Sequence, residues 1–270
     1  MSPARAVVLT GGPTHDFPAT TACLAGLLAE QGLTADVYED VEAGLRALPG
    51  AALLVVNALR WTMRGPGAPQ RYRALADAQG TSPDAGARAA FAAHLGAGSG
   101  VLAMHTASIC FDDWPQWAAA LGGAWRWGHS SHPPLGELAV KVAAPEHPLV
   151  AGLSDFTIVD ERYSDLVLGD LVLGGPAEQP EENTEENTVA ALLVADGQPL
   201  LWAREHGGGR VVYDALGHHP PSYAVPEHRE IVRRAIRWTA GPAAATGPGT
   251  AAGTAAGTGA GTGAGTEAVS

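Results

Sequence analysis

Lysine, cysteine and long hydrophobic runs are all scarce in this chain of 270 residues. Its only lysine, Lys141, lies in an alternating run without a glycine-rich loop before it, which argues against Schiff-base and P-loop chemistry. No nucleotide cofactor is therefore expected. The two cysteines, Cys23 and Cys110, are too few for a disulfide framework and are typical of reduced thiols in a cytoplasmic protein.

No apolar stretch reaches the ~18 residues that a membrane-spanning helix needs. The run Ala6–Leu9 is too short for the core of a signal peptide and has no cleavage site after it. Positive charge is scarce as well, because 28 aspartates and glutamates oppose 16 lysines and arginines, for a formal net charge of −12. Binding a nucleic-acid backbone needs clustered lysine and arginine. We therefore expect neither a membrane nor a nucleic-acid partner.

Large side chains are almost absent from the last thirty residues, which are nearly all glycine, alanine, threonine and proline. Such a segment cannot bury enough apolar surface to offset the entropy lost on ordering. We therefore expect one folded domain over residues 1–240 and a disordered tail over 241–270. The acidic insert Glu178–Asn187 is interpreted as a solvated loop, because consecutive like charges repel.

Short apolar runs alternate with helical patterns in the first half of the chain. Continuous apolar runs of this length are typical of parallel strands that are buried on both faces. The expected strands are Ala6–Leu9, Ala35–Tyr38, Leu53–Val56 and Val101–Met104, with helices near Thr20–Gln31 and Asp84–Leu95 between them. Strand–helix–strand alternation at this spacing predicts a doubly wound α/β fold with a mostly parallel sheet.

The second half contains more strands and fewer helices. The expected strands are Leu138–Ala143, Thr157–Val159, Asp165–Leu173, Val189–Val194, Leu200–Trp202 and Arg210–Tyr213. A terminal helix over Glu227–Thr239 would place Ile231, Ala235 and Trp238 on one face. This pattern predicts an antiparallel extension of the sheet.

Histidines follow three of the predicted strands. His15 with Asp16 comes after the first strand, His105 directly after Val101–Met104, and His218 after Arg210–Tyr213. Ligands in open α/β sheets bind beyond the carboxyl ends of the strands, so we expect one shared functional site there. The alternative for each histidine is a purely structural hydrogen-bonding role.

The segment Gly98–His105 is typical of a strand that ends in a sharp elbow before a helical turn. In α/β hydrolases and amidotransferases the elbow residue is a nucleophilic serine or cysteine. Here the elbow residue is His105, which suits a base or a metal ligand. Ser108 and Cys110 follow three and five residues later and would point elsewhere. Glutamine amidotransferase chemistry is therefore not expected.

Two further segments supply polar and aromatic side chains. The loop Trp125–His132 contains two histidines, an arginine and two tryptophans, a composition that suits sugar stacking and hydroxyl binding, or else an interface or lid. Its His129 has metal-ligand spacing with His132 only if a third ligand comes from elsewhere. Asp160–Tyr163 supplies a carboxylate for a metal site or an acid–base pair, or forms an ordinary glutamate–arginine surface pair. Four other histidines are assigned no role: His94, His147, His206 and His228.

These motifs together resemble the ThuA-like family, named for trehalose utilisation, which has the flavodoxin-like fold of class I glutamine amidotransferases. The resemblance covers about Ala6 to Thr239. It rests on Leu9–Asp16, Gly98–Ser108, Trp117–Gly123 leading to His129, His147–Leu153, Asp160–Tyr163 and Gly207–His218, in this order. The sequence departs from the family pattern at Ala103, where a glycine is expected two residues before the elbow histidine.

The resemblance implies a cytoplasmic protein of sugar catabolism that acts on trehalose, a related glycoside or a 3-keto-sugar. It implies a site made of His15, His105, His129, Glu161 and His218. A divalent metal (zinc, manganese or cobalt) on His15, His105, His129 and His218 is the expected cofactor. Leu59–Met63, after the third strand, is interpreted as a specificity loop.

Within that site we expect His105, Glu161, His15 and Asp16 to be catalytic, with Asp16 orienting His15 through its second ring nitrogen. The expected substrate-binding residues are Trp61, Arg126, Trp127 and Tyr163. Metal-assisted proton transfer would make the protein a sugar isomerase, or a lyase or hydrolase of keto-glycosides.

Two other functions stay open: a non-catalytic sugar-binding or regulatory module, and a thiol hydrolase that uses Cys110. Exposed tryptophans near the site (Trp61, Trp114, Trp125, Trp127) could line a sugar cleft or the seam of a homo-oligomer.

Overall fold

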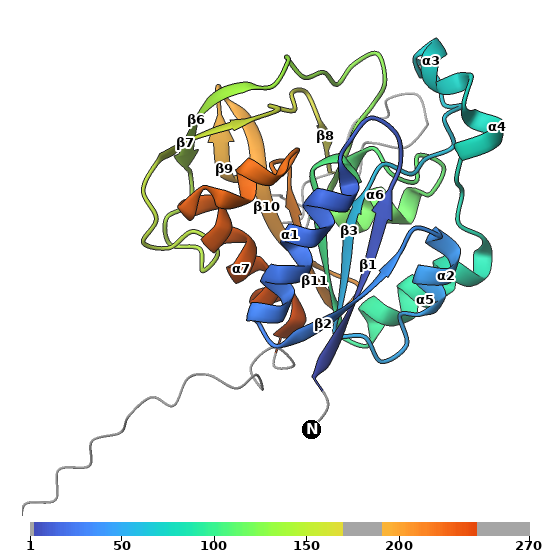
Figure 1. The fold of residues 1–270 in the computed structure, drawn as a ribbon, viewed down its shortest axis with the longest axis horizontal. Helices are drawn as coiled ribbons and strands as arrows, with labels where there is room; N and C mark the ends of the chain where they lie inside the picture. Colours follow the sequence, from blue (N-terminus) through green and yellow to red (C-terminus); the bar gives the residue numbers. More distant parts are fainter. Residues whose placement is uncertain (1–2, 170–190, 242–270) are drawn as a thin grey trace, which may run out of the picture.

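The computed structural model describes residues 3–169 and 191–241. Within these residues a nine-stranded sheet has the order β2-β1-β3-β4-β11-β10-β9-β6-β7 (Figure 1). Its first five strands are parallel: β2 (Leu33–Tyr38), β1 (Ala4–Gly11), β3 (Leu53–Ala58), β4 (Gly100–Met104) and β11 (Gly209–Asp214). The other four continue the sheet antiparallel: β10 (Gln198–His206), β9 (Ala191–Ala195), β6 (Gly136–Val142) and β7 (Phe156–Asp160).

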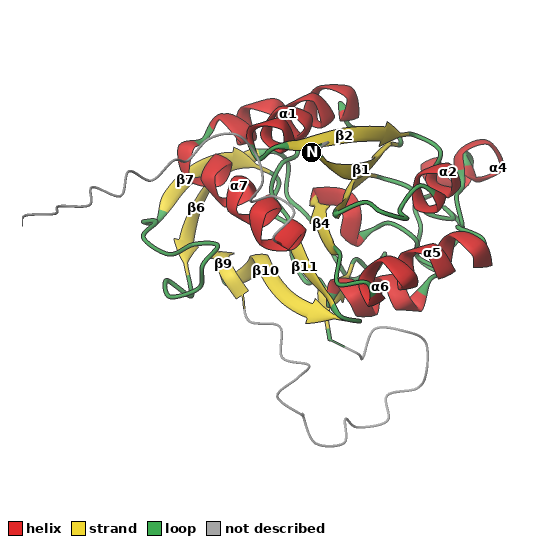
Figure 2. Cartoon of the chain, turned by 90° about the horizontal axis from the view of Figure 1, so that it is seen from below, coloured by secondary structure: helices red, strands yellow, loops and turns green. Residues whose placement is uncertain are grey.

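Helices cover both faces of the parallel half (Figure 2). One face carries α1 (Phe17–Glu30) and α7 (Pro226–Ala240), and the other carries α2 (Val41–Arg46), α5 (Ala85–Gly96) and α6 (Pro115–Leu121). Shorter elements are α3 (Gln70–Arg73), α4 (Ala76–Gln79), the 3₁₀ turns η1 (His105–Ser108) and η4 (Pro220–Ala224), and the small pair β5 (Gly123–Ala124) and β8 (Val167–Leu168). This is the expected mostly parallel α/β sheet with an antiparallel extension.

Strand burial follows position in the sheet. Every residue of β3 and β4 is buried, because these central strands have helices on both faces. The expectation that Ala35–Tyr38 is buried on both faces is wrong, because β2 is the edge strand and Val37 is 48% exposed. In β7 the buried positions alternate with exposed ones, and Asp160 occupies a buried position.

Helix caps agree with the sequence signals. Asp84 accepts a hydrogen bond from the backbone N–H of Ala87 and caps α5. The expected inner face of α7 is also found: Ile231 and Ala235 are buried and Trp238 is partly buried. None of the helices in the described ranges combines the length and apolar character needed to cross a bilayer.

Some expectations fall outside these ranges. The acidic insert Glu178–Asn187 and residues 242–270 of the tail lie outside the described residues, as does the end of the expected strand Asp165–Leu173. The part of that strand that is described forms only the short β8.

Candidate functional site

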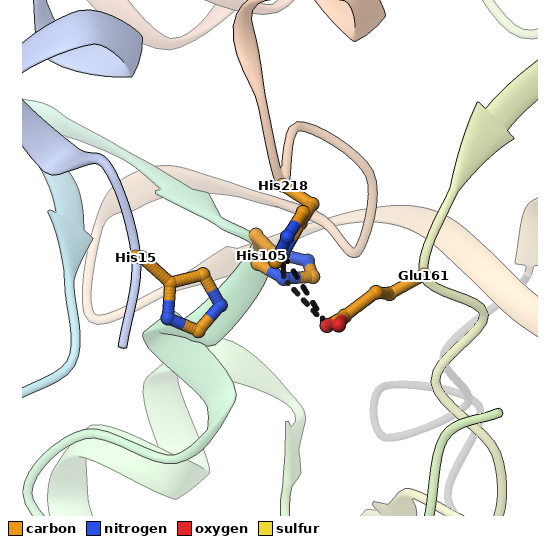
Figure 3. Close-up of side chains that lie close together, drawn as sticks. All are labelled: His15, His105, Glu161 and His218. Atoms are coloured by element: carbon orange, nitrogen blue, oxygen red, sulfur yellow. Dashed lines mark hydrogen bonds and ion pairs between the residues drawn. The ribbon is translucent and has the colours of Figure 1, made fainter. Parts of the chain in front are cut away.

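Four side chains from four different elements meet at one end of the sheet (Figure 3). His15 lies in the loop after β1, His105 begins η1 after β4, His218 follows β11, and Glu161 follows β7. One ligand atom of each lies within 4.8 Å of those of the other three. The carboxyl ends of β1, β4 and β11 share one edge of the sheet, so the fold itself brings the three histidines together. We call these four residues the histidine cluster.

His105 is held rigidly at the elbow. Its backbone has a φ of 45°, a strained value for a non-glycine residue, and its side chain is 2% exposed. Nδ1 lies 2.7 Å from the carbonyl oxygen of Ala215, so it carries the proton and donates it there. Nε2 faces the cluster, 3.3 Å from Nδ1 of His218 and 3.4 Å from Oε2 of Glu161. The elbow forms although Ala103 replaces the expected glycine.

His15 has an unsatisfied ring nitrogen. Its Nδ1 lies 3.2 Å from Thr14 Oγ1 and 3.4 Å from the carbonyl oxygen of Pro13, whereas its buried Nε2 has no hydrogen-bond partner among the described residues. Figure 3 shows the ring with a nitrogen turned toward the other three side chains. Burial, together with the nearby His105 and His218, lowers the pKa of His15 to about 4. His15 is therefore a neutral imidazole at pH 7.

Glu161 supplies the negative charge of the cluster. Its Oε2 lies 3.4 Å from both His105 Nε2 and His218 Nδ1. Burial opposes ionisation, but the hydrogen bonds and positive charge of these two imidazoles outweigh it and hold the pKa of Glu161 below its usual value. The hydrogen bond to Glu161 in turn raises the pKa of His218.

Asp160 holds two segments of the cluster in place, a role not expected from the sequence. Its carboxylate is 0% exposed and accepts hydrogen bonds from the backbone N–H of Glu161 (2.7 Å), Gly217 (2.9 Å) and His218 (3.3 Å), and from the hydroxyl of Ser222 (2.5 Å). It therefore ties the end of β7 to the loop after β11. The sequence does contain a signal for this role. Positions 156, 158 and 160 alternate on the inward face of the strand, and the last of them is a carboxylate.

Two expected site residues lie elsewhere. Asp16 caps α1 by accepting a hydrogen bond from the N–H of Ala19, so its carboxylate serves the helix and the expectation that it orients His15 is wrong. His129 is exposed and is not part of the cluster. Its neighbour His132 comes closer, with Nδ1 3.6 Å from Oε1 of Glu161.

The aromatic residues divide into buried and accessible ones. Trp61 is fully buried and packs against Tyr72 and Trp127, and Trp114 is 2% exposed, so the expectation that these two tryptophans are exposed is wrong. Trp127 is partly buried and Arg126 is exposed.

Tyr163 is 2% exposed and lies behind the cluster, with its hydroxyl 3.3 Å from Nε2 of His105. Tyr163 therefore supports His105 where a contact with substrate was expected.

The structure argues against a thiol nucleophile and against a glutamate–arginine surface pair. Cys110 is buried, donates to the carbonyl oxygen of Ala58, and has its pKa raised to about 12 by burial. Ser108 accepts a hydrogen bond from the hydroxyl of Tyr213. Arg162 pairs with Asp196, which leaves Glu161 to the histidines.

The residues of the cluster fit a divalent metal. Metal-bound histidines commonly donate their second N–H to a backbone carbonyl, as His105 does to Ala215. Tetrahedral bonds of about 2.0–2.1 Å would place ligand atoms about 3.4 Å apart, close to the separations of 3.3 and 3.4 Å found around His105. The orphaned Nε2 of His15 is a lone pair without a donor, as expected of an atom that binds a cation.

The fold is shared with several solved structures. A ThuA-like protein from Parabacteroides merdae is 17% identical over 88% of this chain and 90% of its own, with a TM-score of 0.65. A ThuA-like protein from Bacteroides uniformis is 18% identical over 87% and 91%, with a TM-score of 0.58. A cytoplasmic protein from Salmonella typhimurium is 13% identical over 86% and 98%, with a TM-score of 0.52. No curated protein matches the sequence.

The sequence also matches a family model. The match runs over residues 5–239 and contains every member of the histidine cluster as well as Asp160. The family carries the description trehalose utilisation. The resemblance drawn from the ordered motifs is thereby confirmed, and the chain belongs to the ThuA family.

Proposed function

We propose that this protein is an enzyme of carbohydrate catabolism that acts on a sugar or a 3-keto-glycoside by metal-assisted acid–base chemistry at the histidine cluster. The observation that carries the proposal is the meeting of three imidazoles and one ionised carboxylate, with Nε2 of His15 left without a partner among the described residues. The description of the family, trehalose utilisation, favours a glycoside as substrate. A neighbour in fold is named a cytoplasmic protein, and we propose the same location for this chain.

His15, His105 and His218 would hold the metal, with Glu161 beside them. Zinc, manganese or cobalt suits such a set of nitrogen and oxygen ligands. When bound, a divalent ion supplies Lewis-acid stabilisation of the negative charge that develops on sugar oxygens.

Glu161 is the proposed base. Its lowered pKa keeps it ionised at neutral pH, the state in which a carboxylate can accept a proton. Its Oε2 faces His105 and His218, whereas Oε1 faces the more exposed His132. Oε1 is therefore the oxygen nearer to an incoming substrate.

The C–H bond next to a ketone is the bond that such a base can break. In a 3-keto-glycoside Glu161 would take the proton from C2, and the electron pair would form a C1–C2 double bond as the bond from C1 to the aglycone oxygen breaks. The leaving oxygen then takes a proton, and the products are an unsaturated keto-sugar and an alcohol. In the isomerisation of a hydroxy-ketone, Glu161 would instead return the proton to the former carbonyl carbon, while the proton of the neighbouring hydroxyl moves to the former carbonyl oxygen through the enediol.

Substrate recognition would come from the loop beside the cluster. Trp127 is partly buried and could stack on the apolar face of a sugar, and the exposed Arg126 could bind hydroxyls. Buried Trp61 supports Trp127 from below, at 6.0 Å between ring centroids.

Glu161→Gln tests the proposal. Loss of the base should lower turnover of a 3-keto-glycoside by about 10²–10⁴-fold while sugar binding, measured by calorimetry, is largely retained. Glu137→Gln, on an exposed position of β6, is the matched control and should behave as wild type. Unchanged turnover in Glu161→Gln would exclude Glu161 as the base. Saturable sugar binding without turnover in the wild type, indifferent to chelator, would favour the non-catalytic binding module.

A further inference from the structure

Arg60 carries a positive charge that no carboxylate of the described residues neutralises. Its buried Nε has no hydrogen-bond partner within those residues, and no ion pair of the described chain includes its guanidinium. Two other arginines are paired: the exposed Arg64 with Asp77 and the partly exposed Arg162 with Asp196. Arg60 is itself only partly exposed.

The backbone of Arg60 is anchored to the segment that begins with His105. Its N–H donates to Sγ of Cys110 (3.3 Å), and its carbonyl accepts from the N–H of Phe111 (2.9 Å). The hydroxyl of Thr106 donates to the carbonyl oxygen of Ala58, the last residue of β3, which Arg60 follows. Arg60 is therefore fixed beside the elbow, although it is about 45 residues away in the sequence.

The side chain of Arg60 lies over the loop that carries His15. A Cβ on Gly11 would come within 2.5 Å of Nη2 of Arg60, so the absence of a side chain at Gly11 makes room for the guanidinium. Strand β3, which Arg60 follows, lies between β1 and β4 in the sheet. The guanidinium therefore occupies the carboxyl edge of the sheet between the segments that supply His15 and His105.

An unpaired guanidinium in this position is unfavourable for the free protein. Arginine stays charged at any physiological pH, so the group cannot relieve its burial by losing a proton. Its planar fork of N–H donors matches the two oxygens of a carboxylate or a phosphate. A site that keeps such a donor unpaired is arranged to receive an anion.

We propose that Arg60 binds an oxyanion on the substrate, so that the sugar processed at the histidine cluster carries a carboxylate or a phosphate ester. This inference rests on the proposed function, because it assigns the class of sugar to the same site. It also replaces Trp61 by its neighbour Arg60 as the residue of the Leu59–Met63 segment that contacts the ligand.

Calorimetry with glucuronate, glucose 6-phosphate and glucose tests the proposal on wild type, Arg60→Gln and Arg60→Lys. At least one of the two anions should bind wild type more tightly than glucose, and the preferred anion distinguishes a carboxylate from a phosphate. Arg60→Gln should weaken that binding by about 10- to 100-fold, because a hydrogen bond to a charged group is lost, with Arg60→Lys between the two. The control Arg64→Gln, whose guanidinium already pairs with Asp77, should bind as wild type.

Equal binding of glucose and both anions, unchanged affinity in Arg60→Gln, or no detectable binding of either anion would overturn the assignment. A thermal melt of Arg60→Gln separates binding from structure: its midpoint should stay the same or rise, whereas an arginine that holds the fold together would lower it. Because these measurements need no turnover, an inactive wild type that binds an anion through Arg60 would contradict the proposed reaction and leave this inference standing.

Discussion

The part of the chain that the structure describes contains two groupings of histidine with a carboxylate, and their surroundings differ. In the closed pair, Nε2 of His228 lies 3.0 Å from Oδ2 of Asp214 and its Nδ1 lies 2.8 Å from the carbonyl oxygen of Ser222. Asp214 also accepts from the N–H of Leu216, and the two residues of the pair are 0% and 1% exposed. In the histidine cluster, His105 and His218 contact the partly exposed carboxylate of Glu161, and a buried nitrogen of His15 has no partner among the described residues.

The difference separates a structural role from a functional one. The closed pair satisfies its buried polar atoms internally and joins α7 to the end of β11, so it has nothing left with which to bind a ligand. The cluster has more donors and acceptors than it can pair, and it lies where the strands of the sheet end. Composition alone does not distinguish the two, since each consists of histidine and an acidic residue.

The largest expected effect is on stability, from breaking the closed pair. His228→Ala leaves Oδ2 of Asp214 buried without its imidazole partner, which should lower the free energy of unfolding by about 3–5 kcal/mol. His218→Ala, in the partly exposed cluster, should cost about 1 kcal/mol or less. Urea denaturation of both variants measures the contrast. Equal losses would show that the cluster is as structural as the pair.

Asp160→Asn should weaken the cluster without unfolding the protein. The amide keeps the size of the carboxylate but cannot accept all four hydrogen bonds that position Glu161 and His218. Loss of such an outer partner typically lowers metal affinity about 10- to 100-fold. Competition with a chromogenic chelator measures that affinity, and Ser222→Ala, which removes only one of the bonds, should lose less. Wild-type metal affinity in Asp160→Asn would limit Asp160 to a structural role.

The last expected effect, the smallest within any one pH unit, is a pH dependence carried by His15. Burial depresses its folded pKa to about 4 from 6.5, so between these values the unfolded chain binds the proton and the folded chain does not. The free energy of unfolding of the metal-free protein should therefore fall as pH falls from about 6.5 to about 4, by at most about 1.4 kcal/mol per pH unit. His15→Gln should flatten this slope in thermal melts. An unchanged slope would show that His15 is not buried as a neutral group.

The position of strands in the sheet explains what the sequence predicted well. The sequence predicts that His15, His105 and His218 lie together, because parallel strands end at a common edge. The structure confirms that they meet at that edge. Glu161 comes from the antiparallel half, and its approach depends on β7 lying beside β6 and on the bonds of Asp160, which no local pattern specifies.

Side-chain direction explains the wrong expectations. Asp16 follows His15 directly and also precedes the first turn of α1. Its carboxylate accepts a hydrogen bond from the N–H of Ala19 in that turn and so caps the helix. His129 and His132 are three residues apart in one loop, and only the loop's path decides that His132 faces Glu161. Trp61 lies next to Arg60, and the hydrophobic effect favours burying the indole and leaving the charged group at the edge.

Metal content measured by mass spectrometry on the purified protein tests the central claim, that the histidine cluster is a metal site. Near-stoichiometric zinc, manganese or cobalt is expected in wild type and in the exposed-loop control His129→Ala, with much less in His105→Ala. His218→Ala should show the same loss. The side chain of His218 is partly exposed, so this variant is expected to fold even if removal of the buried His105 prevents folding. No metal in wild type after loading, or equal metal in all four proteins, would contradict the claim.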